Sequence, residues 1–208
     1  MLQKLYDKYV CPHLINYAMQ MKPFRKQREK VIPFASGRVL EIGIGSGLNF
    51  NYYNKENVAE VFAVEPDEIL MEKAKQNAKI NNINLNVQQL KAEELPFDNN
   101  SFDTIISTYT MCSIPGLSSA MSEINRVVKP NGKLLFSEHG KSPDMNVFKW
   151  QKRMNGIQKR IAGGCHLDVD IPNEIIKANF KLNKIDSMYV PGPKFLSYHY
   201  WGVASPLK

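Results

Sequence analysis

Residues 38–47 read RVLEIGIGSG, a short apolar run that leads into three alternating glycines. The apolar positions of residues 39–42 predict a buried strand, because a run of this length bounded by glycine is typical of the inside of a sheet. Glycine lacks a Cβ atom, so residues 43–47 can turn sharply and approach a ligand closely. Residues 48–53 are expected to be helical, which would direct the loop amides towards a pocket at the end of the strand.

Two types of nucleoside-binding loop place glycines after a first strand. The dinucleotide motif G-x-G-x-x-G needs its third glycine at position 48, but that residue is Leu48 and the glycine comes one residue early. The observed spacing, E-x-G-x-G-x-G, resembles motif I of the class I S-adenosylmethionine-dependent methyltransferases. That resemblance implies that the cofactor is held by Glu41, Gly43, Ile44, Gly45, Gly47 and Asn49.

The composition limits what else the chain can be. Its 208 residues, 43% hydrophobic and 23% charged, are ordinary for one globular domain. There is no apolar run of about 18 residues, and residues 1–7 lack the apolar core of a secretion signal. Cys11, Cys112 and Cys165 are an odd number without a C-x-x-C pair, so their spacing suggests neither a disulfide framework nor a zinc site. We therefore expect a metal-free protein of the reducing cytoplasm.

Basic residues give the chain a formal net charge of +7 and gather in residues 22–30 and 149–160. An anionic membrane surface or a nucleic acid could bind such stretches. Two solvated helix faces are the favoured explanation, because no stacking-aromatic motif accompanies the charge. We expect no specific nucleic-acid partner, while a peripheral membrane contact stays open and the oligomeric state is not determined.

Strand and helix signals alternate through most of the chain, which predicts an α/β protein with a mostly parallel sheet. After the first strand, further strands are expected at residues 60–65, 85–90, 102–108, 133–137, 182–189 and 195–204. The last two should pair antiparallel, because only a short link around Pro191-Gly192-Pro193 joins them. Helical spacing is found near residues 2–9 and 14–18 and over residues 67–80, 120–128, 144–162 and 172–178.

These elements predict one domain over residues 1–208 with a Rossmann-like, seven-stranded, mostly parallel sheet and helices on both faces. Strands one to five should have the order 3-2-1-4-5, with the last two strands at the far edge and the last one antiparallel. We expect residues 1–37 to form an N-terminal helical cap, residues 38–138 the cofactor-binding half and residues 139–208 the substrate-side half. In similar enzymes the N-terminal helices close over the cofactor, here with Tyr6 and Tyr9.

Two more stretches resemble the cofactor site of the class I methyltransferases. Glu65 ends the second predicted strand, where a carboxylate can accept both ribose hydroxyls, and Pro66 follows it. Residues 91–97, KAEELPF, resemble the family's adenine-binding loop, commonly D-A-E-x-L-P-F. Lysine stands where the family has aspartate, so the adenine contact is expected from the backbone of Ala92 or from Glu93.

Two later stretches complete the resemblance. Residues 101–103, SFD, which lead into Thr108 and Tyr109, resemble motif IV, whose strand end lines the pocket beside the reactive methyl group. Residues 123–134 are close to the family's E-x-x-R-V-L-K-P-G-G-x-L, a segment expected to shape the turn into the fifth strand. With all five elements in order, a chance match is implausible.

Three shorter stretches resemble a narrower subgroup of methyltransferases: CSI at residues 112–114, FSEHG at 136–140 and GGCHL at 163–167. The subgroup contains small bacterial enzymes of unassigned substrate and eukaryotic methyltransferase-like proteins that act on alkyl thiols at membranes. Residues 1–7 do not resemble the membrane anchor of those eukaryotic relatives. The resemblance therefore implies the chemistry more than the location.

Methyl transfer from a sulfonium requires the acceptor and the methyl group to be held close together with water excluded, and a base is optional. Strands four and five are neighbours in the expected sheet, so Tyr109, Cys112, Glu138 and His139 should border one cavity. His139 is the preferred base because its ordinary pKa lies near neutral pH, although it could equally stabilise a loop. His166 follows a Gly-Gly pair and could lie on a lid over the cavity or simply follow a helix end.

Trp150 lies on an apolar helix face together with Met154, Ile157 and Ile161. Core packing explains this face without further assumption, and a lipophilic-substrate lid or a membrane contact would also fit. Cys112 is expected to pack in the core by default, and it lies on the substrate side with His166 and Trp150. The spacing of Cys112, His139, Cys165 and His166 matches no usual metal site.

The sequence thus predicts an S-adenosylmethionine-dependent methyltransferase that acts on a small, lipophilic acceptor and releases S-adenosylhomocysteine. A thiol, an amine, a phenol and a lipid- or quinone-like molecule are the candidate acceptors. The alternatives are a cofactor-binding protein with little or no turnover, favoured by the lysine at residue 91, and an RNA or protein methyltransferase. An NAD-linked oxidoreductase is disfavoured by Leu48 and by the lack of a Tyr-x-x-x-Lys pair in the middle of the chain.

Overall fold

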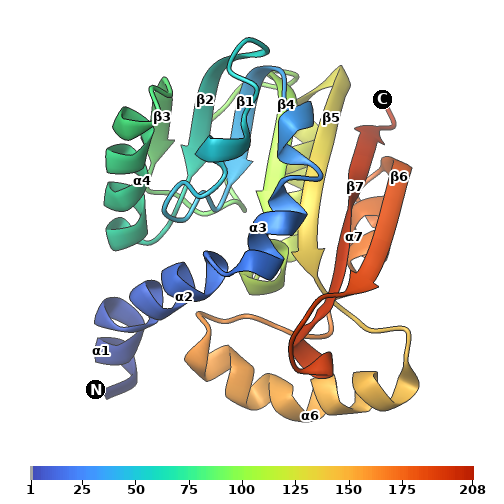
Figure 1. The fold of residues 1–208 in the computed structure, drawn as a ribbon. Helices are drawn as coiled ribbons and strands as arrows, with labels where there is room; N and C mark the ends of the chain where they lie inside the picture. The colour runs from blue at the N-terminus through green and yellow to red at the C-terminus, as the bar shows by residue number, and fades with distance from the viewer. Residues whose placement is uncertain (1) are drawn as a thin grey trace.

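A single mixed sheet of seven strands organises the chain, and the computed structural model describes residues 2–208 of it (Figure 1). The strand order is β3-β2-β1-β4-β5-β7-β6. Strands β1 to β5 run parallel, whereas β7 is antiparallel to both of its neighbours, which confirms the predicted sheet. The strands are β1 (Gly37–Ile42), β2 (Val58–Val64), β3 (Leu85–Gln88), β4 (Phe102–Thr108), β5 (Val128–His139), β6 (Phe180–Tyr189) and β7 (Tyr198–Pro206).

Helices flank the sheet and cover its lower end in Figure 1. The α-helices are α1 (Leu2–Tyr9), α2 (Cys11–Met19), α3 (Lys22–Arg28), α4 (Glu68–Ile80), α5 (Leu117–Val127), α6 (Met145–Ile161) and α7 (Ile171–Lys177). Short 3-10 turns lie at η1 (Ile32–Phe34), η2 (Phe50–Tyr52), η3 (Met111–Ser113) and η4 (Lys194–Leu196). The helix expected over residues 48–53 is only the turn η2, because side chains at both ends of this segment are tied to β1, as described below. As the sequence predicts, the Asp67 carboxylate caps α4 by accepting the Leu70 N–H at 2.9 Å.

The core has two layers, one on each face of the sheet. Alternate residues of β1 point to opposite faces, so Leu40 and Ile42 join one layer and Val39 joins the other. The first layer includes apolar residues of α5 and α7, and the second includes Ala74 and Ala78 of α4. Because both faces are covered, the inner strands are nearly continuous apolar runs.

The apolar face of α6 is not part of this core, so core packing was the wrong interpretation for it. Trp150, Ile157 and Ile161 are 55%, 55% and 52% exposed, and the only fully buried residue of the helix is Gln151. Gln151 holds the preceding loop by bonding Ser142 and Gly140. Within residues 2–208, no helix combines the length and the apolar character needed to cross a membrane.

Candidate active site

The glycine loop after β1 has the left-handed backbone that its sequence predicts. Gly43, Gly45 and Gly47 have φ angles of +62°, +57° and +79°, which residues with a side chain rarely adopt. A Cβ atom on Gly43 would collide with the side chain of Thr110, and one on Gly47 would collide with Phe50. Gly45 differs, because a Cβ there would meet no atom within 4 Å. The middle glycine therefore borders open space, while the outer two fix the shape of the loop.

The buried Glu41 of β1 stabilises this loop through hydrogen bonds. Its carboxylate is 1% exposed and accepts hydrogen bonds from Asn49 Nδ2 at 2.6 Å and from the Tyr53 hydroxyl at 2.7 Å. Burial raises the pKa of Glu41 to about 7, although both hydrogen bonds work in the opposite direction. Glu41 and Gly47 do not line the cavity described next, so the structure gives them a supporting position rather than one beside a ligand.

A cavity of about 330 Å³ lies at the carboxyl ends of β1, β2 and β4. This is where ligands bind in open sheets of this type. Ten of the residues predicted to hold the cofactor line it: Gly43, Ile44, Gly45, Asn49, Glu65, Pro66, Ala92, Glu93, Thr108 and Tyr109.

Glu65 directly follows β2, and its carboxylate contacts the backbone of Gly45. Its carboxylate is 5% exposed and accepts the N–H groups of Gly45 at 2.8 Å and Asp67 at 3.0 Å. Burial raises the pKa of Glu65, and these two N–H groups offset part of that increase. A carboxylate has about four acceptor sites, so Glu65 keeps acceptor capacity for hydroxyl groups in the cavity.

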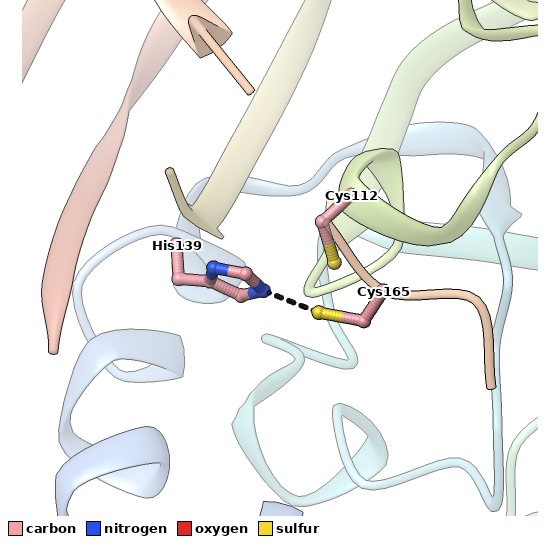
Figure 2. A group of neighbouring side chains, drawn as sticks. All are labelled: Cys112, His139 and Cys165. Carbon is pink, nitrogen blue, oxygen red and sulfur yellow. Dashed lines mark hydrogen bonds between the residues drawn. The ribbon is translucent and has the colours of Figure 1, made fainter. Parts of the chain in front are cut away.

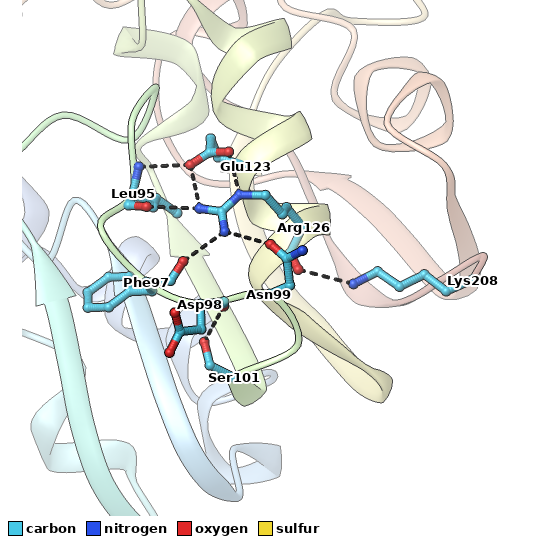
Figure 3. A network of polar contacts seen from close by, with 8 residues as sticks. All are labelled: Leu95, Phe97, Asp98, Asn99, Ser101, Glu123, Arg126 and Lys208. Carbon is cyan, nitrogen blue, oxygen red and sulfur yellow. Dashed lines mark hydrogen bonds and ion pairs between the residues drawn. The ribbon is translucent and has the colours of Figure 1, made fainter.

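The loop at residues 91–97 is held against the sheet by an arginine clamp from α5 (Figure 3). Arg126 donates to the Leu95 carbonyl at 2.8 Å, the Phe97 carbonyl at 2.7 Å and Asn99 Oδ1 at 2.9 Å. Glu123 pairs with Arg126 at 2.7 Å and accepts the Leu95 N–H at 2.9 Å. The E-x-x-R part of residues 123–134 thus anchors the loop expected to bind adenine, which the sequence interpretation had not assigned to it.

Helix α2 forms a wall of the cavity that the sequence interpretation did not resolve into residues. Its residues Cys11, Pro12, Ile15, Asn16 and Met19 line the cavity, and Asn16 accepts the Ser46 hydroxyl at 2.5 Å. The N-terminal helices therefore do close over the loop, but not through the two predicted tyrosines. Tyr6 donates to the Ile161 carbonyl at 2.7 Å, which ties α1 to α6, and Tyr9 is 53% exposed. Amphipathic spacing in this region marked a helix but could not show which face meets the loop.

Tyr109 lines the cavity and is surrounded by buried side chains from distant parts of the chain. Its hydroxyl lies 3.1 Å from His199 Nδ1, and the edge of its ring meets Phe24. Burial lowers the pKa of His199 to about 3, so its imidazole is neutral and can accept a hydrogen bond from the Tyr109 hydroxyl. Arg28, expected on a solvated basic face, is instead 3% exposed, and its guanidinium lies 5.3 Å from the centre of the Tyr109 ring. Burial lowers the pKa of Arg28.

Glu138 and His139, two of the three predicted catalytic residues, do not line the cavity. Glu138 is fully buried, accepts the Ser107 hydroxyl at 2.8 Å and is bonded by the Thr110 N–H at 3.0 Å and 3.1 Å. Burial raises the pKa of Glu138 to about 8. The expectation that Tyr109, Cys112, Glu138 and His139 all border one cavity therefore holds for Tyr109 alone, because Cys112 is buried within the turn after β4 and the other two lie behind that turn.

Cys112, His139 and Cys165 meet behind this turn (Figure 2). His139 Nε2 lies 3.0 Å from the Cys165 sulfur. The neighbouring Cys165 thiol lowers the pKa of Cys112 well below its ordinary value, and His139 acts in the same direction. The nearby Cys112 in turn raises the pKa of Cys165. Spacing along the sequence gave no sign of this cluster.

The two remaining predicted substrate-side residues lie apart from the cavity. Trp150 is on the exposed face of α6. His166 is half-buried, and its backbone N–H donates to the Cys112 carbonyl at 2.8 Å. A hydrogen bond there ties the loop after α6 to the turn η3, so His166 is part of a fixed contact and does not lie over the cavity.

Comparison with known proteins connects this site to a family. Residues 40–136 match the family model described as "Methyltransferase domain". Thiol S-methyltransferase TMT1B from Rattus norvegicus is 30% identical over 147 residues, which cover 68% of this chain and 59% of the rat protein. The ubiquinone/menaquinone biosynthesis C-methyltransferase UbiE from Rickettsia prowazekii is 31% identical over 147 residues, 65% of this chain and 57% of its own length. The chain thus matches about three fifths of these curated relatives.

Solved structures share the fold at low sequence identity. The YcgJ protein from Bacillus subtilis has a TM-score of 0.67 at 17% identity, covering 89% of this chain and 98% of its own. The BH2331 protein from Bacillus halodurans C-125 has a TM-score of 0.72 at 16% identity, covering 88% of this chain and 98% of its own.

Proposed function

Because this chain belongs to the class I S-adenosylmethionine-dependent methyltransferases, we propose that it transfers a methyl group from S-adenosylmethionine to a small, lipophilic thiol. One observation carries the cofactor part of this proposal: open space borders Gly45 in a cavity whose wall includes the buried Glu65. S-Adenosylmethionine supplies an activated methyl group on a sulfonium. The protein then has to bind the two substrates, orient them for methyl transfer and exclude water.

The residues of the cavity fit such a nucleoside. Glu65 is placed to accept ribose hydroxyls, and Gly45 leaves room for the sugar beside it. Asn49 Oδ1 is buried without a hydrogen-bond partner in the described chain, so it offers an acceptor to an amino group of the ligand. Ala92 and Glu93 would meet the adenine edge, and Glu93 is already held by the Gly116 N–H at 3.2 Å.

We propose that the acceptor enters between α2 and Tyr109. Ile15, Met19 and Ile114 give this part of the cavity an apolar lining, which suits a lipophilic molecule. A thiol is favoured over an amine or a phenol because the matched thiol S-methyltransferase is among the most similar relatives and because a thiolate sulfur is intrinsically very nucleophilic. We assign Tyr109 to contact the acceptor, and Glu138 to position Tyr109 through the Thr110 N–H. Residues 1–208 would then act as one domain with residues 1–37 as its cap.

Titration calorimetry with S-adenosylmethionine tests the cofactor site. Gly45→Arg fills the open space and should abolish binding, and Glu65→Gln should weaken it about tenfold. Gly156→Arg is the matched control, because Gly156 also borders open space but lies on α6. Equal affinity of Gly45→Arg and Gly156→Arg for the cofactor would refute the proposed site.

An acceptor panel tests the reaction. Release of S-adenosylhomocysteine should be fastest with hexane-1-thiol and slower with hexylamine or 4-butylphenol. Faster turnover of the amine or the phenol would overturn the choice of a thiol. Cofactor binding without turnover of any acceptor would instead indicate a binding protein.

We also propose that the protein works in the reducing cytoplasm and contacts an anionic membrane through α6. Trp150, Ile157 and Ile161 expose apolar surface on this helix, and Arg153 lies 5.5 Å from the Trp150 ring centre. Apolar groups next to basic residues are typical of helices that lie on a membrane surface. The protein should co-sediment with phosphatidylglycerol vesicles, and the Trp150→Ser variant should not. Equal binding to phosphatidylcholine vesicles would refute the proposed attraction to anionic headgroups.

A further inference from the structure

Three metal-binding side chains meet although they come from separate elements. Cys112 lies in η3 after β4, His139 ends β5, and Cys165 lies in the loop after α6. Their ligand atoms all lie within 4.8 Å of one another, and Figure 2 shows the three side chains pointing toward a common centre. Cys112 is 3% exposed and Cys165 6% exposed, so the cluster is shielded from solvent.

Two thiols and one imidazole are a donor set that suits zinc and similar thiophilic ions. Zn–S bonds of about 2.3 Å and Zn–N bonds of about 2.0 Å place neighbouring ligand atoms of a tetrahedral site roughly 3.5–3.8 Å apart. The 3.0 Å separation of His139 Nε2 and the Cys165 sulfur would have to open by about half an ångström, a change that side-chain rotation can supply.

Neighbouring groups support both sulfurs, as is usual around metal ligands. The Ser113 hydroxyl lies 3.5 Å from the Cys112 sulfur, and Gln158 Nε2 donates to the Cys165 sulfur at 3.8 Å. The bond from the His166 N–H to the Cys112 carbonyl fixes the two cysteine-bearing segments relative to each other. The two cysteine-bearing segments are therefore held together before any ion binds.

The group contains three ligands, and no fourth His, Cys, Asp or Glu of residues 2–208 joins it. Zinc sites with three protein ligands are typical of catalytic centres, which keep the fourth position for water or substrate. The cluster lies directly behind the cavity wall, because Ser113, which follows Cys112, and Gly163, two residues before Cys165, both line the cavity.

We propose that Cys112, His139 and Cys165 bind one zinc-class divalent ion, with water at its fourth position. The ion would hold η3, the end of β5 and the loop after α6 together, and with them the part of the cavity wall that Ser113 and Gly163 form.

Metal titration of the whole protein tests the ion site. The chain is reduced with tris(2-carboxyethyl)phosphine, stripped with a chelator and titrated with Co²⁺ and Zn²⁺. We expect one ion per chain and a thiolate-to-Co²⁺ charge-transfer band that Zn²⁺ abolishes. Cys112→Ser, Cys165→Ser and His139→Gln should lose this band, and Cys11→Ser is the matched control that keeps it, because Cys11 is buried but outside the cluster.

Measurements on the unmodified protein keep the inference testable even if the variants misfold. A protein that binds S-adenosylmethionine by calorimetry but takes up no Co²⁺ or Zn²⁺ would overturn the ion site and leave the proposed function standing. Uptake of one ion without cofactor binding would instead defeat the proposed function.

Discussion

The arginine clamp on the loop at residues 91–97 should be important for both stability and cofactor binding. Arg126→Met keeps a good helix former in α5 but removes two hydrogen bonds to the loop, one to Asn99 and the ion pair with Glu123. The paired side chains are 32% and 23% exposed, so each bond contributes less than a buried charged one. We expect a loss of roughly 2–4 kcal/mol in the free energy of unfolding.

Urea denaturation measures this loss, and the chain offers a matched control. Lys177, whose side chain is 61% exposed, pairs with Glu174 at the same i,i+3 spacing and at 2.9 Å, so Lys177→Met should cost less than about 0.5 kcal/mol. A double-mutant cycle of Arg126→Met with Glu123→Gln should give a coupling of at least about 1 kcal/mol, because both residues bond Leu95. The same variant should bind S-adenosylmethionine about tenfold more weakly. If Arg126→Met costs no more than Lys177→Met, the clamp does not anchor the loop.

The glycine loop and two buried titratable groups give further predictions. Gly45→Ala should lose about 1 kcal/mol of stability, since the positive φ is the only source of strain there. Gly43→Ala should lose clearly more, because its new Cβ atom also collides with Thr110. Equal losses in urea denaturation would contradict this difference between the two glycines. The pKa of Glu138 is about 8 in the folded protein and near 4.5 in the unfolded chain. The wild type should therefore lose stability relative to Glu138→Gln as the pH rises from 5 to 8. Stability curves of the two proteins that stay parallel over this range would refute the raised pKa. His199 titrates at about 3 when folded and near 6.5 when unfolded, so acid should destabilise the wild type between pH 6.5 and 3, and His199→Phe should flatten that fall in a series of urea titrations.

Much of the cofactor side of the site was predictable because its signals are local. The glycines, Glu65 and residues 91–97 are joined to strand ends by short segments, so strand order alone brings them to one edge of the sheet. Strand order alone was not sufficient to place Glu138 and His139 relative to the cavity. Both lie at the carboxyl end of β5, but the turn that contains Thr110 separates them from the cavity.

Sequence alone thus determined the parallel sheet, its order and the nucleoside loop, because strand periodicity and glycine spacing act over a few residues. Tertiary structure alone decided which surfaces meet: α2 against the loop, Arg28 and His199 around Tyr109, and Cys112 beside His139 and Cys165. These residues are far apart along the chain, and loop conformations that no local pattern fixes bring them together. The packing of the helices and loops that carry these residues, rather than any sequence motif, sets the positions of their side chains.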